Sequence, residues 1–86
     1  MKRSSLCDTE KDINRQIGLR LRQARIKRGL TLQKLGASFG ISHQQIQKYE
    51  TGADCLSAAK VMRLAEVLAV SVSYFYDAPV HAGLDD

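Results

Sequence analysis

Hydrophobic residues recur along this chain at intervals of three and four, which is the spacing of one side of an α-helix. The first such set is Ile13, Ile17, Leu21 and Ala24. Thr9 or Asp12 can cap the start of this helix, and Gly29 is a typical C-terminal stop. We therefore predict a first helix that begins near Ile13 and ends before Gly29.

A second, shorter helix is predicted between Thr31 and Gly40. Threonine is a good N-cap because its hydroxyl accepts a hydrogen bond from a free N–H of the first turn. The apolar positions that follow again have helical spacing: Leu32, Leu35 and Phe39. Gly40 ends this helix, because glycine readily adopts the left-handed conformation found at helix ends.

The third predicted helix follows almost at once. Ser42 and Gln45 have the spacing of a capping box, with serine at the N-cap and glutamine at the third helical position. Helical spacing turns Ile46 and Tyr49 inward, and Gly52 is the natural stop. The opposite face carries polar side chains: His43, Gln44, Gln47 and Lys48. Together with the preceding helix and glycine turn, this helix makes a helix-turn-helix motif.

Two more helices are predicted in the second half of the chain. Residues 57–68 carry one apolar stripe, formed by Val61, Leu64, Ala65 and Leu68. Ser71 or Ser73 caps a short fifth helix around residues 74–76, and Pro79 prevents its continuation. No segment alternates between polar and apolar residues for long enough to predict a strand.

The length of 86 residues fits one compact domain. We expect an all-α fold of five helices around one core at residues 13–77. The polar stretch at residues 1–12 is expected to be a flexible N-terminal arm, and residues 78–86 a flexible C-terminal tail. Apolar residues make up 44% of the chain, which is enough for a folded globule.

The charge is distributed unevenly. The net charge is +4, and no Asp or Glu lies between Ile13 and Tyr49. The cations of that stretch are Arg15, Arg20, Arg22, Arg25, Lys27, Arg28, Lys34 and Lys48. Such a one-signed block suits a polyanion such as DNA. A solvated helix surface would give the same charge pattern. The helix-turn-helix motif favours the interpretation that this surface binds DNA.

Other function classes lack their usual signatures. Cys7 and Cys55 form no CxxC or Cys/His pattern, and His43 and His81 are isolated, so neither a metal nor another cofactor is expected. No apolar run approaches the roughly 20 residues of a membrane span, and the first 12 residues do not resemble a signal peptide. No nucleophile–base pair or phosphate-binding glycine loop is present. We expect a cytoplasmic protein without enzymatic activity, small-molecule substrate or membrane association.

The order and spacing of these motifs are similar to those of lambda-repressor-like (Xre/Cro type) helix-turn-helix regulators. The resemblance extends from about Ile13 to Tyr76 and is carried by Gly29–Gly36, Phe39–Ser42, Ile46, Tyr49–Gly52 and Leu64–Ser71. It implies a five-helix domain that binds double-stranded DNA with its third helix in the major groove. The expected function is sequence-specific transcriptional regulation, with repression as the expected mode.

The resemblance also implies which side chains contact DNA. His43, Gln44 and Lys48 are the expected base contacts, since Gln can pair with adenine and Lys with guanine in the major groove. Contacts to the DNA backbone or groove edge are expected from Thr31, Gln33, Ser42, Gln45 and Gln47. The alternative interpretation is that this face is only solvated.

A structural ion pair between Arg25 and Glu50 is a further implication of the resemblance. It would hold the third helix against the first, because the planar guanidinium can bond a carboxylate twice. The alternative is that Arg25 binds phosphate.

Three positions depart from the family pattern. Leu32 stands where the family usually has Gln, which puts DNA contacts from the second helix in doubt. Asp54 lies in a loop that often carries Lys or Arg, so we expect few phosphate contacts there. Gly36 replaces the usual alanine of the second helix, and glycine permits close approach to a neighbouring helix.

A homodimer is expected, at least on DNA, because one helix contacts only a few base pairs. The candidate surfaces are the pair Leu19 and Ile26, or the C-terminal cluster of Val72, Tyr74, Phe75, Tyr76 and Val80. Core packing is the alternative for the aromatic residues, and the alternative for Leu19 and Ile26 is that they are scattered apolar residues on the surface. The alternative function is a protein-interaction module such as an antitoxin or adaptor, which would select no DNA sequence.

Overall fold

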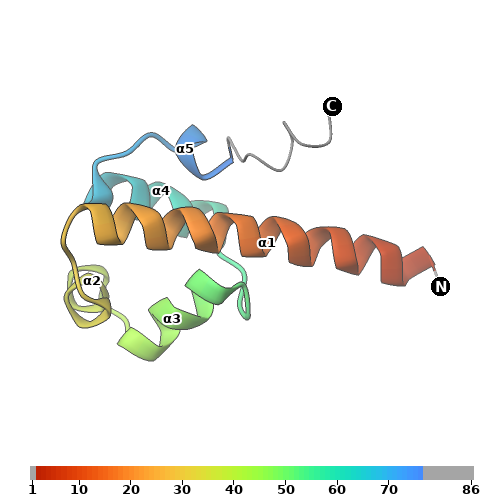
Figure 1. The fold of residues 1–86 in the computed structure, drawn as a ribbon, viewed down its shortest axis with the longest axis horizontal. Helices are drawn as coiled ribbons and strands as arrows, with labels where there is room; N and C mark the ends of the chain where they lie inside the picture. The colour runs from red at the N-terminus through yellow and green to blue at the C-terminus, as the bar shows by residue number, and fades with distance from the viewer. Residues whose placement is uncertain (1, 77–86) are drawn as a thin grey trace.

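The computed structural model describes residues 2–76 of the chain, and their side chains from Thr9 onward. The described residues form five helices and no strand, which confirms the predicted all-α class (Figure 1). The helices are α1 (Lys2–Lys27), α2 (Leu32–Phe39), α3 (His43–Thr51), α4 (Ala58–Leu68) and α5 (Ser73–Tyr76). The predicted tail at residues 78–86, with Pro79, Val80 and His81, lies outside the described residues.

The start of the first helix was predicted wrongly. The structure continues α1 to Lys2, so neither Thr9 nor Asp12 is its cap, and residues 2–12 belong to the helix. These residues contain no Gly or Pro that would interrupt a helix. The N-terminal half of α1 extends past the other helices (Figure 1). Ile13, predicted to face inward, is consequently 46% exposed.

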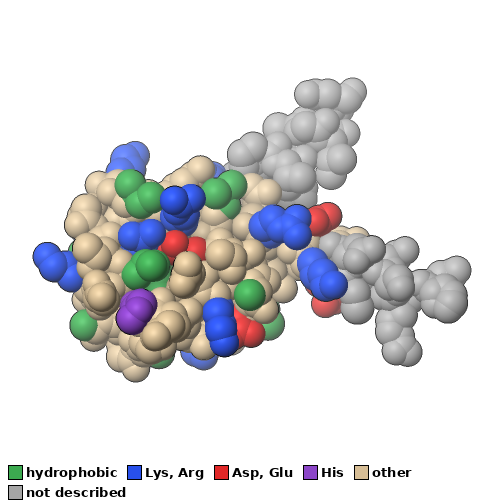
Figure 2. Space-filling model, turned by 60° about the horizontal axis from the view of Figure 1, so that its bottom comes forward, with side chains coloured by type: hydrophobic (Ala, Val, Ile, Leu, Met, Phe, Trp, Pro, Cys, Tyr) green, Lys and Arg blue, Asp and Glu red, His purple; other side chains and the backbone are tan. Residues whose placement is uncertain are grey.

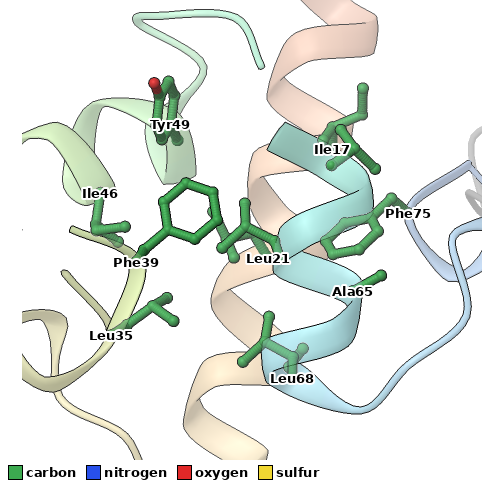
Figure 3. Close-up of a cluster of buried hydrophobic side chains, with 12 residues drawn as sticks. Ile17, Leu21, Leu35, Phe39, Ile46, Tyr49, Ala65, Leu68 and Phe75 are labelled. Atoms are coloured by element: carbon green, nitrogen blue, oxygen red, sulfur yellow. The ribbon is translucent and has the colours of Figure 1, made fainter. Parts of the chain in front are cut away.

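The core receives side chains from all five helices. Figure 3 shows Leu21 of α1, Leu35 of α2, Ile46 of α3, Leu68 of α4 and Phe75 of α5 converging on one cluster. These five side chains are completely buried. Burial of each such side chain is worth about 1.5–3 kcal/mol relative to exposure, so the third helix is firmly attached to the rest of the domain.

The predicted caps at Thr31 and Ser42 begin α2 and α3, and Ser57 caps α4 in the same way. The hydroxyls of Thr31, Ser42 and Ser57 accept hydrogen bonds from the backbone N–H groups of the residues three positions later. Gly40 and Gly52 end α2 and α3 with φ +83°. The predicted boundaries of the middle three helices are therefore confirmed.

Two glycines allow helices and turns to approach closely. A Cβ on Gly36 would lie 2.6 Å from the carbonyl oxygen of Ile41, so the close contact at this position is with the turn before α3 and not, as expected, with a neighbouring helix. A Cβ on Gly18 would overlap the carbonyl oxygen of Tyr49, so α1 and α3 cross here in backbone contact. The role of Gly18 was not anticipated from the sequence.

The short helix α5 is attached to α1. The hydroxyl of Tyr74 donates to the carbonyl oxygen of Arg20 at 3.1 Å, and the Arg20 guanidinium lies 4.4 Å from the centroid of the Tyr74 ring. Phe75, next in the chain, is fully buried. Phe75 therefore belongs to the core, which was the alternative given for the aromatic residues, while Val72 and Tyr76 remain 38% and 45% exposed.

Candidate nucleic-acid interface

The turn between α2 and α3 is short and closed by backbone hydrogen bonds. The N–H groups of Gly40 and Ile41 both donate to the carbonyl oxygen of Gly36, at 2.7 and 2.9 Å. Ser42 then caps α3 through its hydroxyl, which accepts from the N–H of Gln45 at 3.2 Å. The direction of α3 relative to α2 is thus fixed by local bonds as well as by the core.

One side of α3 is buried and the other is open. Ile46, Tyr49 and Glu50 are at most 8% exposed. We use the term α3 face for the side chains that remain on the outside of the first two turns: His43, Gln44, Gln47 and Lys48. Gln44, Gln47 and Lys48 are exposed, and His43 is half-buried at the N-terminal end of the face. The structure therefore brings the three expected base contacts, His43, Gln44 and Lys48, onto the outside of one helix.

The N-terminus of α2 also carries exposed polar side chains. Thr31, Gln33 and Lys34 are exposed. The Thr31 hydroxyl oxygen accepts from the N–H of Lys34 at 3.0 Å, which leaves its O–H able to donate. Leu32, the departure from the family pattern, is half-buried and packs against the core. This position therefore contributes to packing rather than to a polar surface.

Arg25 and Glu50 meet between α1 and α3. Arg25 Nε donates to Glu50 Oε2 at 2.6 Å, and Nη2 donates to Oε1 at 3.2 Å. Arg25 Nη1 also donates to the carbonyl oxygen of Leu30 at 2.9 Å. The two side chains are only 12% and 5% exposed. With its guanidinium engaged in this way, Arg25 is not available as a phosphate-binding group.

The loop after α3 folds back onto that helix. Gln45 Nε2 donates to Asp54 Oδ2 at 2.8 Å, and the backbone N–H of Asp54 donates to the carbonyl oxygen of Lys48 at 3.2 Å. The Gln45 side chain therefore extends to Asp54, and only the serine half of the predicted capping box is observed. The contact between Gln45 and Asp54 was not predicted, because a separation of nine residues does not by itself indicate a side-chain hydrogen bond.

Positive charge surrounds the α2–α3 side of the domain. Figure 2 turns this side forward and shows Lys and Arg side chains distributed around it, with fewer acidic ones. Six cations of the acid-free stretch are exposed: Arg15, Arg22, Lys27, Arg28, Lys34 and Lys48. Of these, Lys34 and Lys48 belong to α2 and α3 themselves. The surface combines hydrogen-bonding amides with cations, as a protein surface that binds DNA requires.

Two other kinds of site are absent from the part of the chain that the structure describes. No group of three or more His, Cys, Asp and Glu residues there could hold a metal ion. No helix in that part is long and apolar enough to cross a membrane.

Comparisons with known proteins agree with this geometry. A helix-turn-helix family model matches residues 21–75. An uncharacterized HTH-type transcriptional regulator from Sinorhizobium medicae is 42% identical over 72 residues, covering 83% of this chain and 52% of the relative. An uncharacterized transcriptional regulator in the ATPase CF(0) region of Rhodospirillum rubrum is 38% identical over 77 residues, covering 84% of this chain and 71% of the relative.

A solved structure is similar as well. The restriction-modification controller protein C.AhdI from Aeromonas hydrophila has a TM-score of 0.71 to this chain at 25% sequence identity, covering 79% of this chain and 97% of that chain. The chain spans about half the length of the Sinorhizobium medicae relative.

Proposed function

Because the chain belongs to the lambda-repressor-like, Xre-type helix-turn-helix family, we propose that it is a transcriptional regulator that binds a specific double-stranded DNA sequence. In this proposal α3 enters the major groove, where each base pair displays a distinct pattern of donors and acceptors. Regulation by repression is the mode we propose, since a bound domain blocks access to the DNA that it covers.

The α3 face is the observation that carries this proposal. It presents two amides, an imidazole and an ammonium group from a helix that is capped at both ends and buried along its other side. We assign base contacts to His43, Gln44 and Lys48. Contacts to phosphate or the groove edge are assigned to Thr31, Gln33, Ser42, Gln45 and Gln47, among which Thr31 and Ser42 have hydroxyl hydrogens available for donation.

Selection of bound sequences from a random duplex pool tests the proposal. A regulator that contacts bases enriches one motif, and the affinity for this motif exceeds that for random duplex by at least about 10³-fold. A protein-interaction module, the alternative function, would enrich no motif. Equal affinity for selected and random duplexes would reject sequence-specific binding by this domain.

We further propose that two copies bind the DNA together. Two copies of α3 would contact half-sites about 34 Å apart, which is one turn of the duplex. Exposed apolar side chains are available for such an association, among them Leu19 and Ile26 on α1 at 45% and 54% exposure. Sedimentation velocity of the chain with and without the selected duplex tests whether two copies bind. A complex of one chain with one duplex, bound at a single half-site at saturating protein, would contradict this proposal.

The proposed site of action is the cytoplasm, because the relatives named above are bacterial and bacterial chromosomes lie there. The domain organisation proposed for the chain is a DNA-binding unit at residues 13–77 with short flanking segments. The proposed activity is DNA binding without a chemical reaction.

A further inference from the structure

Asp54 lies in the loop after α3 and is bonded to that helix at two points. Its carboxylate accepts a hydrogen bond from Gln45 Nε2 at 2.8 Å, and its backbone N–H donates to the carbonyl oxygen of Lys48 at 3.2 Å. The side-chain bond joins Asp54 to the first turn of α3, and the backbone bond joins it to a later turn. Asp54 therefore has a defined position beside the helix.

The backbone on both sides of this bond is fixed. Gly52 directs the loop back along α3 with φ +83°, and a Cβ at Gly52 would lie only 2.9 Å from the Cα of Arg15. The Gln45 backbone is held by its N–H bond to the Ser42 hydroxyl at 3.2 Å. Because both backbones are held, the Gln45–Asp54 hydrogen bond can restrict the half-buried Gln45 side chain to one orientation.

Gln45 keeps hydrogen-bonding capacity when it is bound to Asp54. A glutamine amide has two N–H donors and a carbonyl oxygen with two lone pairs, and Asp54 uses one donor. The second N–H and Oε1 form the combination of donor and acceptor that pairs with N7 and N6 of adenine in the major groove. A side chain that is already held loses less freedom on binding than a mobile one.

We propose that Asp54 is a positioning residue for DNA recognition, which holds the Gln45 amide so that Gln45 selects adenine at one position of the bound sequence. This inference rests on the proposed function and deepens it, since it adds Gln45 to the base-contacting residues and explains why a carboxylate stands in this loop. A carboxylate at this place repels phosphate, so its contribution is to specificity and not to overall affinity.

The test measures the dissociation constants of the full chain for its selected duplex and for duplexes with each base pair replaced in turn. Gln45→Ala should reduce the preference for one adenine by about fivefold or more. Asp54→Ala should reduce the preference at that same position by about two- to tenfold, which is the effect of one hydrogen bond. Asp54→Asn should retain the preference, because the asparagine carbonyl oxygen still accepts the bond while the negative charge is gone.

Glu66→Ala is the matched control, because Glu66 is an exposed acid on α4, outside the helix-turn-helix. It should leave the preference at every position unchanged. In the free protein, the side-chain amide NMR signal of Gln45 should shift in Asp54→Ala and stay in place in Glu66→Ala. These readouts follow the Gln45 amide directly and do not report on folding alone.

The proposal is overturned if Asp54→Ala keeps the full preference, if Asp54→Asn loses as much as Asp54→Ala, or if Gln45→Ala changes no position. If Asp54→Ala fails to fold, the Gln45→Ala and Asp54→Asn results still decide. A wild-type chain that enriches no sequence contradicts the proposed function instead, so the two failures are distinguishable.

Discussion

Arg25 on the last turn of α1 bonds Glu50 at the end of α3 through two nitrogen atoms, at 2.6 and 3.2 Å. The pair fixes α3 at its C-terminal end, while the Ser42 cap and the α2–α3 turn fix its N-terminal end. The side chains of the α3 face are thereby presented on a helix that is held at both ends. A helix held in this way needs little reorganisation before it enters a groove.

Glu50→Ala should destabilise the domain by about 3 kcal/mol, because it leaves a nearly buried guanidinium without its carboxylate. Urea unfolding followed by circular dichroism measures this change. Asp12→Ala is the control, since Asp12 forms an ion pair with Arg15 at 3.5 Å while both side chains are about 70% exposed. The control should change stability by less than about 1 kcal/mol. An unchanged unfolding midpoint for Glu50→Ala, together with tighter DNA binding, would show that Glu50 acts only by repelling phosphate.

Gly36→Ala should also destabilise the domain, by about 1–3 kcal/mol, although alanine has the higher helix propensity. The new Cβ would lie 2.6 Å from the carbonyl oxygen of Ile41, so the turn before α3 must shift. Ser38→Ala, at an exposed position of the same helix, controls for propensity and should be neutral or slightly stabilising. Thermal unfolding of both variants gives the comparison. A more stable Gly36→Ala protein would mean that the turn accommodates the methyl group at no cost.

Local features of this fold were predictable from sequence because their causes are local. A serine or threonine cap acts within one turn of its own helix, and the caps at Thr31 and Ser42 are observed where they were predicted. The helical spacing of apolar residues similarly identified most of the core. The contact between Arg25 and Glu50 was predicted from the resemblance to a family, because the spacing of apolar residues does not indicate it.

The features that were not predicted from the sequence either depend on distant parts of the chain or lack a local sequence pattern that would indicate them. The first helix continues to Lys2 without an apolar stripe, so periodicity could not locate its start. Gly18 is needed because α3 crosses α1 there, which no residue near Gly18 indicates. The bond between Gln45 and Asp54 depends on the path of the loop after Gly52. The contacts of Gly18 and of Gln45 with Asp54 depend on the tertiary arrangement, which local spacing does not encode.

Gln44→Ala should weaken binding to the selected duplex by about 1–3 kcal/mol and leave binding to random duplex nearly unchanged. Gln44 is exposed on the α3 face, where a glutamine amide can bond two atoms of one base. Gln23→Ala is the matched control, because Gln23 is an exposed glutamine on α1, outside the helix-turn-helix. Fluorescence anisotropy with both duplexes measures the effect. Equal losses on the two duplexes would assign Gln44 to the DNA backbone and not to a base.

Lys34→Gln should reduce affinity for selected and random duplexes by the same factor, since an ammonium group that contacts phosphate does not distinguish sequences. Lys34 is exposed in the first turn of α2, beside the Thr31 cap. Loss of one phosphate contact should make the slope of log affinity against log salt concentration shallower by about 0.9.

The wild-type slope should itself be shallow, because the loop at residues 52–56 contains Asp54 and no Lys or Arg.

Lys27→Gln is the control for the loss of one positive charge in Lys34→Gln. Lys27 lies nine residues after Gly18, where α1 crosses α3, so helical geometry turns it to the opposite side of α1. If both variants change the slope equally, the effect comes from net charge, and Lys34 makes no phosphate contact of its own.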